Sequence, residues 1–79
     1  MKKIIFRFCG GARDGQAVRS DGPHTERNEA DAIWKLTWKG TVGRRFDVSA
    51  LDCTVIQRYQ IKSKYELGEE VHLNCEHVD

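Results

Sequence analysis

The sequence predicts an all-β or β-rich α+β fold: a single antiparallel sheet of five to six short strands, curled or half-barrel in shape, with at most one or two short helical turns. Two observations support this fold class. Apolar and polar residues alternate in several segments, which is the periodicity of half-buried strands. Glycines separate many of these segments, as turns require. With 79 residues the chain forms one domain, residues 1–79.

The N-terminal segment predicts a hairpin over residues 2–19. Ile4, Phe6 and Phe8 alternate with polar residues in a first strand at 2–9. A glycine-rich loop at 10–15 ends this strand, and residues 16–19 return as a short second one. Asp14 is expected to accept a hydrogen bond from the backbone of its own turn.

The middle of the chain predicts a surface connection followed by two strands. Residues 20–31 are polar, and Thr25 is expected to cap one or two helical turns that end near Ala32. Alternation over 32–38 predicts a central strand that buries both tryptophans, Trp34 and Trp38. A three-residue loop, 39–41, would join it to a strand over 42–48, with the guanidinium of Arg44 at the sheet margin in water.

The C-terminal segment predicts the longest strand and a last hairpin. Residues 49–53 suit a turn or a single helical turn capped by Ser49. A strand over 54–67 exceeds the usual strand length, so a bulge is expected near Ser63. Its apolar face is formed by Val55, Tyr59, Ile61, Tyr65 and Leu67. The last strand begins at Val71, and pairing of Leu67 with Val71 would place Lys62 opposite Glu76 and Glu66 opposite His72.

Composition indicates a soluble cytoplasmic protein. Hydrophobic residues make up 39% and charged residues 32% of the chain, which argues against disorder. The apolar run Ile4-Ile5-Phe6 is too short to span a bilayer, and Arg7 interrupts it before a secretory signal could form. Three cysteines at wide spacing are typical of reduced thiols.

Several motifs resemble a group of small bacterial proteins of the planctomycete type. These motifs are the run from Phe8 to Gly15, the G-x-x-G-x-x-F turn from Gly40 to Phe46, and the segment from Tyr59 to His77. The similarity covers most of the chain. This sequence departs from the pattern at Ala12, a position at which those proteins often have proline. The resemblance implies no activity and transfers no site residue.

Basic residues in the middle of the chain form the first candidate site. The formal net charge is only +1, but residues 35–64 contain seven basic residues and two acidic ones, and the C-terminal segment is acidic. The candidate nucleic-acid-binding residues are Lys35, Lys39, Arg44, Arg45, Arg58, Lys62 and Lys64. A curved sheet with such a face can track a single strand. The tryptophans and tyrosines are expected to point inward, however, which leaves no stacking platform. The alternative is a solvated charged face that discourages edge aggregation.

The glycine-rich loop is the second candidate, as an anion or phosphate site. Its backbone N–H groups and two arginines are the types of group that bind phosphate, so the candidate residues are Arg7, Gly10, Gly11, Arg13 and Gly15. The pattern is neither G-x-G-x-x-G nor a P-loop. The alternative is a hairpin loop whose glycines supply positive φ, and the sequence favours it.

Metal binding and catalysis find little support. Cys9, Cys53, His72, Cys75 and His77 are possible ligand types, but the spacing matches no known zinc motif, and alternation puts His72 and Cys75 on opposite faces. No cysteine is paired with a histidine and a carboxylate. No metal, cofactor or catalytic residue is therefore predicted.

The sequence thus predicts a small, non-enzymatic binding or scaffolding module. Its expected partner is another protein or a second copy, paired through a sheet edge. Weak single-stranded nucleic-acid binding through the basic face is the first alternative, and an anion site at residues 10–15 is the second. No membrane association is expected.

Overall fold

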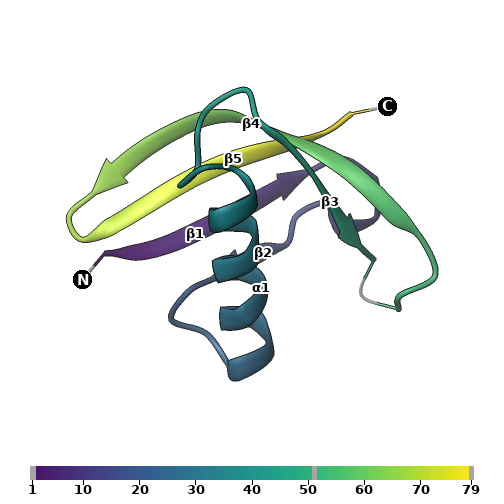
Figure 1. The fold of residues 1–79 in the computed structure, drawn as a ribbon, viewed down its shortest axis with the longest axis horizontal. Coiled ribbons are helices and arrows are strands. Elements are labelled where there is room, and N and C mark those ends of the chain that lie inside the picture. Colours follow the sequence, from purple (N-terminus) through teal and green to yellow (C-terminus); the bar gives the residue numbers. More distant parts are fainter. Residues whose placement is uncertain (1, 51, 79) are drawn as a thin grey trace.

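A curled, half-barrel sheet of five strands forms most of the molecule, with one helix against it (Figure 1). The computed structural model describes residues 2–50 and 52–78. The elements are β1 (Lys3–Cys9), the 3-10 turn η1 (Gly11–Arg13), β2 (Ala17–Arg19), α1 (His24–Leu36), β3 (Arg45–Ser49), β4 (Ile56–Leu67) and β5 (Glu70–Val78). The strand order is β2-β1-β5-β4-β3. The fold is therefore β-rich, as the alternation predicted.

The sheet is mixed rather than antiparallel. The predicted β1–β2 hairpin is confirmed, with Phe6 opposite Val18. On its other side, however, β1 pairs in parallel with β5, and Phe6 lies opposite Leu73. A parallel pair needs a crossover connection, and everything from β2 to β4 lies in that connection. The prediction of a purely antiparallel sheet was wrong because alternation carries no information on strand direction.

The largest error of the sequence prediction concerns residues 24–38. Most of the predicted strand at 32–38 is the second half of α1, a helix of 13 residues rather than one or two turns. Pro23 occupies the N-cap and Thr25 lies inside the helix. The pattern A-I-W-K-L-T-W fits a strand, yet Ala30, Ile33 and Thr37 also recur at helical spacing, and these three side chains are buried. Burial of this helical face against the sheet decides between the two periods.

The segment after the helix also differs from the prediction. No hairpin joins residues 38 and 42, and β3 covers residues 45–49 instead of 42–48. Residues 38–40 instead turn with left-handed backbone angles, φ 54°, 58° and 74°. Arg44 is half-buried and stacks on Trp38 instead of extending into water at the sheet margin. Of the predicted turn at 49–53, Leu51 lies outside the described residues.

A bulge in β4 changes the face of every residue that follows it. The predicted irregularity is confirmed, since the β4–β5 register shifts between Ile61 and Ser63. Tyr59 and Ile61 point into the core, but the bulge moves Tyr65 to the face away from α1, where its ring stacks on His72. Leu67 is 59% exposed. Assigning both to the apolar face was therefore wrong, because one extra residue reverses the alternation.

The β4–β5 turn is one residue shorter than predicted. Leu67 pairs with Glu70 rather than Val71, and Glu66 rather than Leu67 lies opposite Val71. Gly68 has a φ of 59°, which permits a tight turn. Lys62 nevertheless lies 3.9 Å from Glu76, so the predicted ion pair is present although the predicted register is not.

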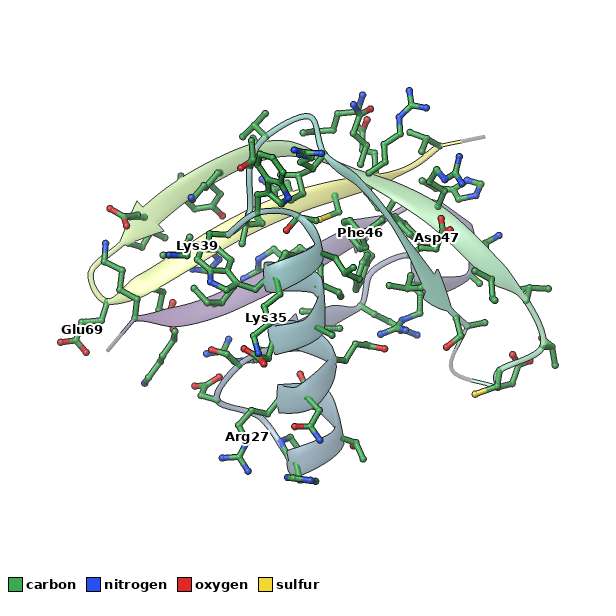
Figure 2. The ribbon with its side chains drawn as sticks, viewed as in Figure 1. Arg27, Lys35, Lys39, Phe46, Asp47 and Glu69 are labelled. Carbon is green, nitrogen blue, oxygen red and sulfur yellow. The ribbon has the colours of Figure 1, made fainter. Side chains whose placement is uncertain are left out.

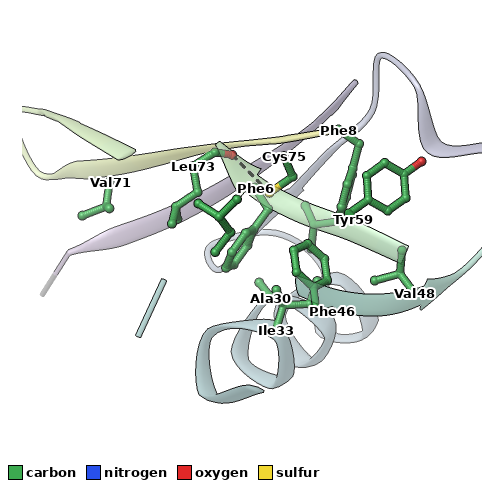
Figure 3. Packing of buried hydrophobic residues seen from close by; sticks show 12 residues of the cluster. Phe6, Phe8, Ala30, Ile33, Phe46, Val48, Tyr59, Val71, Leu73 and Cys75 are labelled. Atoms are coloured by element: carbon green, nitrogen blue, oxygen red, sulfur yellow. Dashed lines mark hydrogen bonds between the residues drawn. The ribbon is translucent and has the colours of Figure 1, made fainter. Parts of the chain in front are cut away.

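The core lies between the sheet and the helix (Figure 3). Its centre is an aromatic cluster in which Phe8 meets Tyr59 at 4.9 Å between ring centroids and Phe46 meets Phe6 at 6.2 Å. Ile33 of α1 packs against this cluster. Burying each such side chain contributes about 1.5–3 kcal/mol. Among the described residues, no helix combines the length and the apolar character needed to cross a membrane.

The left-handed turn after α1 generates a test of the packing. A Cβ atom at Gly40 would lie 2.5 Å from Leu73 Cδ2 and 2.6 Å from Trp34 Cζ3, and φ is +74°. At Gly43 φ is +94°, but a Cβ would meet nothing within 4 Å. We expect Gly40→Ala to lower the free energy of unfolding by about 2–4 kcal/mol and Gly43→Ala by about 1 kcal/mol. Urea denaturation measures both, and equal losses would contradict this packing.

Candidate functional site

The structure divides the seven predicted basic residues between two faces of the sheet. Lys35, Lys39, Arg44 and Lys64 lie on the side of α1. Arg45 and Arg58 alternate with the core residues Phe46 and Tyr59 and so lie on the far side, where Lys62 also pairs with Glu76. Lys64 belongs to the helix side because the β4 bulge reverses its direction. The expected single basic face is therefore not assembled.

Some of these cations form salt bridges with carboxylates, and others have no such partner among the described residues. Lys35 pairs with Asp31 at 3.0 Å, Arg58 with Asp47 at 3.0 Å, and Lys62 with Glu76 at 3.9 Å. Within residues 2–50 and 52–78, no carboxylate lies within 4.0 Å of the remaining four cations, which are Lys39, Arg44, Arg45 and Lys64. Three of these four lie on the helix side. None of these four cations forms a salt bridge with a carboxylate of the described residues.

Trp38 stands at the surface among these cations. Its side chain is 70% exposed, and the guanidinium carbon of Arg44 lies 4.1 Å from the ring centroid. A left-handed φ is unusual for so bulky a residue and costs roughly 1–3 kcal/mol. Thr37 holds this turn, since its buried hydroxyl donates to the carbonyl of Ile33 at 2.7 Å and accepts from the N–H of Gly40 at 3.2 Å. The backbone thus keeps a large aromatic ring in solvent.

Trp34 forms a second, half-buried aromatic position beside the first. The close approach of Gly40 to its six-membered ring fixes the indole against the turn. The ammonium of Lys64 lies 5.3 Å from the ring centroid and 3.3 Å from the carbonyl of Lys39. Both tryptophans line one shallow groove of about 520 Å³. We call Trp34, Trp38, Lys39, Arg44 and Lys64 the tryptophan–cation surface.

Sequence reasoning missed the exposure of Trp38 and the half-buried position of Trp34. It placed them in a strand, where alternation would have buried them. One local signal points to the correct structure: a glycine, Gly40, follows the segment, which is typical of a helix end. Lys35 of α1 and Lys39 of the turn that follows it, both labelled in Figure 2, line the same groove as the two tryptophans.

Five backbone N–H groups of the glycine-rich loop bind partners inside the protein. The N–H groups of residues 10, 12, 13, 14 and 15 bind Asp14 Oδ1, Gln57 Oε1, the Tyr59 hydroxyl, and the carbonyls of residues 11 and 8, respectively. The predicted bond from Asp14 to its own turn is among them. An anion would have to compete with these partners.

The two arginines predicted at the anion site are also engaged. Arg13 is 4% exposed, and its guanidinium binds Glu29 at 2.6 Å and the carbonyl of Ser49 at 2.8 Å. Arg7 donates to His72 Nδ1 at 3.4 Å on the face of the sheet away from α1. The geometry therefore favours a structural loop that joins η1 to α1 and β3, while anion binding stays a prediction.

Acidic and thiol groups elsewhere take structural positions. The hydrogen bond from His72, followed by that from Arg19, lowers the pKa of Glu70. Burial raises the pKa of the Cys75 thiol to about 12. His72 and Cys75 lie on opposite faces of β5, and the described part of the chain gathers no group of three His, Cys, Asp or Glu side chains fit for a metal.

Comparison of the chain with protein-family models, curated proteins and solved structures gave no match. The resemblance to planctomycete-type proteins therefore stays a prediction. The chemistry open to the tryptophan–cation surface follows from its own groups. Exposed rings stack on planar groups, and unpaired cations attract anions.

The thiols provide a test of the described burial. Cys9 and Cys53 are exposed, whereas Cys75 is buried and keeps its proton well above neutral pH. We expect iodoacetamide at mildly alkaline pH to modify the first two in the folded protein and Cys75 only after unfolding, because the thiolate is the nucleophile. Peptide mass spectrometry locates the adducts. Rapid modification of Cys75 in the native protein would contradict its position in the core.

Proposed function

We propose that this protein is a non-enzymatic binding module whose ligand is single-stranded nucleic acid, bound on the tryptophan–cation surface. The observation that carries the proposal is Trp38, a tryptophan that is 70% exposed, held in a left-handed backbone and stacked by Arg44. Aromatic rings beside cations are how proteins bind single strands: the bases stack and the phosphates are neutralised. The sequence predicts that all tryptophans and tyrosines point inward, which would leave no ring for stacking. The exposed ring of Trp38 provides one.

The geometry favours a single strand over a duplex. In a duplex the faces of the bases are stacked on one another, so an indole can reach them only where bases are splayed out. Trp34 and Trp38 line one groove and are four residues apart, which allows two rings to serve neighbouring bases. Lys39, Arg44 and Lys64 border the same rings and can contact the phosphates between them.

The backbone strain at Trp38 also supports a binding role. Residues in rare backbone conformations persist only where the surrounding structure enforces them, and they cluster at functional sites. Burial of the Trp38 ring would have stabilised the folded state by several kcal/mol. The fold instead exposes the ring at a cost in stability. Binding of a planar ligand by the exposed ring is the most direct explanation of that cost.

Docking of a protein partner or of a second copy is the competing proposal. The sheet has two outer strands, β2 with three residues and β3 with five, and β3 exposes Arg45 and Asp47. Short, charged edges discourage strand pairing. The same Trp38 could serve as the centre of a protein interface, since tryptophan and arginine dominate such contacts. An affinity pull-down with and without nuclease distinguishes the two classes of partner.

Replacement of Trp38 tests the proposal. We expect Trp38→Ala to weaken binding of a fluorescein-labelled oligothymidylate by about 5- to 150-fold, because stacking contributes about 1–3 kcal/mol per base. Leu67→Ala removes an exposed apolar side chain on the other face and should leave the affinity unchanged. Fluorescence anisotropy at about 50 mM salt measures both.

Salt dependence provides a second readout of the same complex. If the three unpaired cations of the surface contact phosphates, the slope of log K against log salt should be about −2. Absence of wild-type binding at low salt, or equal affinities of wild type and Trp38→Ala, would refute the proposed function.

A further inference from the structure

A second groove lies between β1 and α1. Its volume is about 580 Å³, within the range of ligand sites. Ile4, Ala30 and Trp34 form its apolar part, and His24, Arg27 and Asn28 of α1 line its outer part. None of the proposed binding residues except Trp34 contributes to it. The groove thus combines apolar side chains in one part with polar side chains in another.

The charges at this groove favour an anionic ligand. Two charged residues of its lining already have partners, since Lys2 is paired with Glu66 and Asp31 with Lys35. Arg27 also lines the groove, and no carboxylate of the described residues lies within 4.0 Å of its guanidinium. Figure 2 shows Arg27 extending away from the helix into solvent. A guanidinium in this state is suited to a phosphate.

Polar groups suited to a base or a sugar lie on the same walls. Asn28 Nδ2 lies 3.2 Å from His24 Nε2, which leaves the amide oxygen of Asn28 as an acceptor. The hydroxyl of Ser20 accepts from the N–H of Ile4 at 2.8 Å, and its own hydrogen can be donated into the groove. Donors and acceptors beside an aromatic floor are the usual means of recognising a nucleoside.

Trp34 connects the two grooves, because it lines both. We propose that a strand bound on the tryptophan–cation surface continues past Trp34 into the groove between β1 and α1, where Arg27 binds a phosphate. This inference rests on the proposed function and extends it. The groove and the surface then form one continuous track along α1, and the groove adds contacts that a short oligonucleotide does not reach.

The length of the helix sets the size of this track. Arg27 and Trp34 are seven residues apart in α1, which corresponds to about 10 Å along the axis. Stacked nucleotides rise about 3.4 Å each, so the groove holds about three of them beyond Trp34. Affinity should therefore increase with oligonucleotide length beyond the few nucleotides that occupy the tryptophan–cation surface.

A charge-matched pair of variants tests this continuation. Arg27→Gln removes the groove cation from an exposed helix position, and Arg58→Gln removes an arginine that pairs with Asp47 on the far face of the sheet. Binding of labelled oligothymidylates of about three and about eight nucleotides is measured for each variant over a range of salt concentrations. Thermal unfolding confirms that both variants are folded.

We expect Arg27→Gln to bind the longer oligonucleotide about 5- to 10-fold more weakly, with a salt slope smaller by about 0.7, and to bind the shorter one as the wild type does. Arg58→Gln should change neither. Equal behaviour of the two variants, with Trp38→Ala still weakened, would overturn the continuation and leave the proposed function intact. Arg27-dependent binding of thymidine monophosphate alone, without an effect on the longer oligonucleotide, would also overturn it. Absence of wild-type binding to either length would refute both.

Discussion

The parallel pairing of β1 with β5 places the first and last strands side by side in the middle of the sheet, and the rest of the architecture follows from it. Seven residue pairs, from Lys3 and Glu70 to Cys9 and Glu76, form this ladder. Because a parallel pair cannot be closed by a tight turn, the residues between the two strands must cross over the sheet. That crossover contains α1, which lies across one face, and β3 and β4, which extend the sheet beyond β5. The turn after α1 then meets β4, and Lys64 reaches Trp34.

Two local features of this architecture form the tryptophan–cation surface. The bulge in β4 directs Lys64 toward the helix and sends Tyr65 to the opposite face, where it covers His72. On that face Arg7, His72, Glu70 and Arg19 form a chain of hydrogen bonds that occupies their charges. The left-handed turn after α1 exposes Trp38 beside Arg44. Three cations without a salt-bridge partner among the described residues, Lys39, Arg44 and Lys64, thus gather on the helix side, although the net charge is only +1.

Alternation of apolar residues was enough to predict β1, β5 and the first half of β4, because these strands bury one face and register is strongly specified there. The bulge was predicted from the length of the strand at 54–67. It was not enough for residues 24–38, whose apolar positions fit periods of both 2 and 3.6 residues. Only packing of Ala30 and Ile33 on the sheet selects the helix. The parallel pair is equally invisible to a local pattern. For the candidate site, the basic residues could be listed from the sequence, but their sorting into paired and unpaired cations depends on contacts such as Arg58 with Asp47. The exposed tryptophan was missed because hydrophobicity alone assigns it to the core.

We propose that a single strand stacks on Trp38 together with Trp34. The most direct measurement is a titration of the ¹⁵N-labelled protein with oligothymidylate at low salt, following the two indole N–H resonances, since the chain contains two tryptophans. We expect saturable shifts of the Trp38 resonance and smaller ones of Trp34, while the amides around Tyr65 and His72 do not shift. Indole resonances that remain fixed at saturating oligonucleotide, or shifts confined to the Tyr65 face, would contradict it.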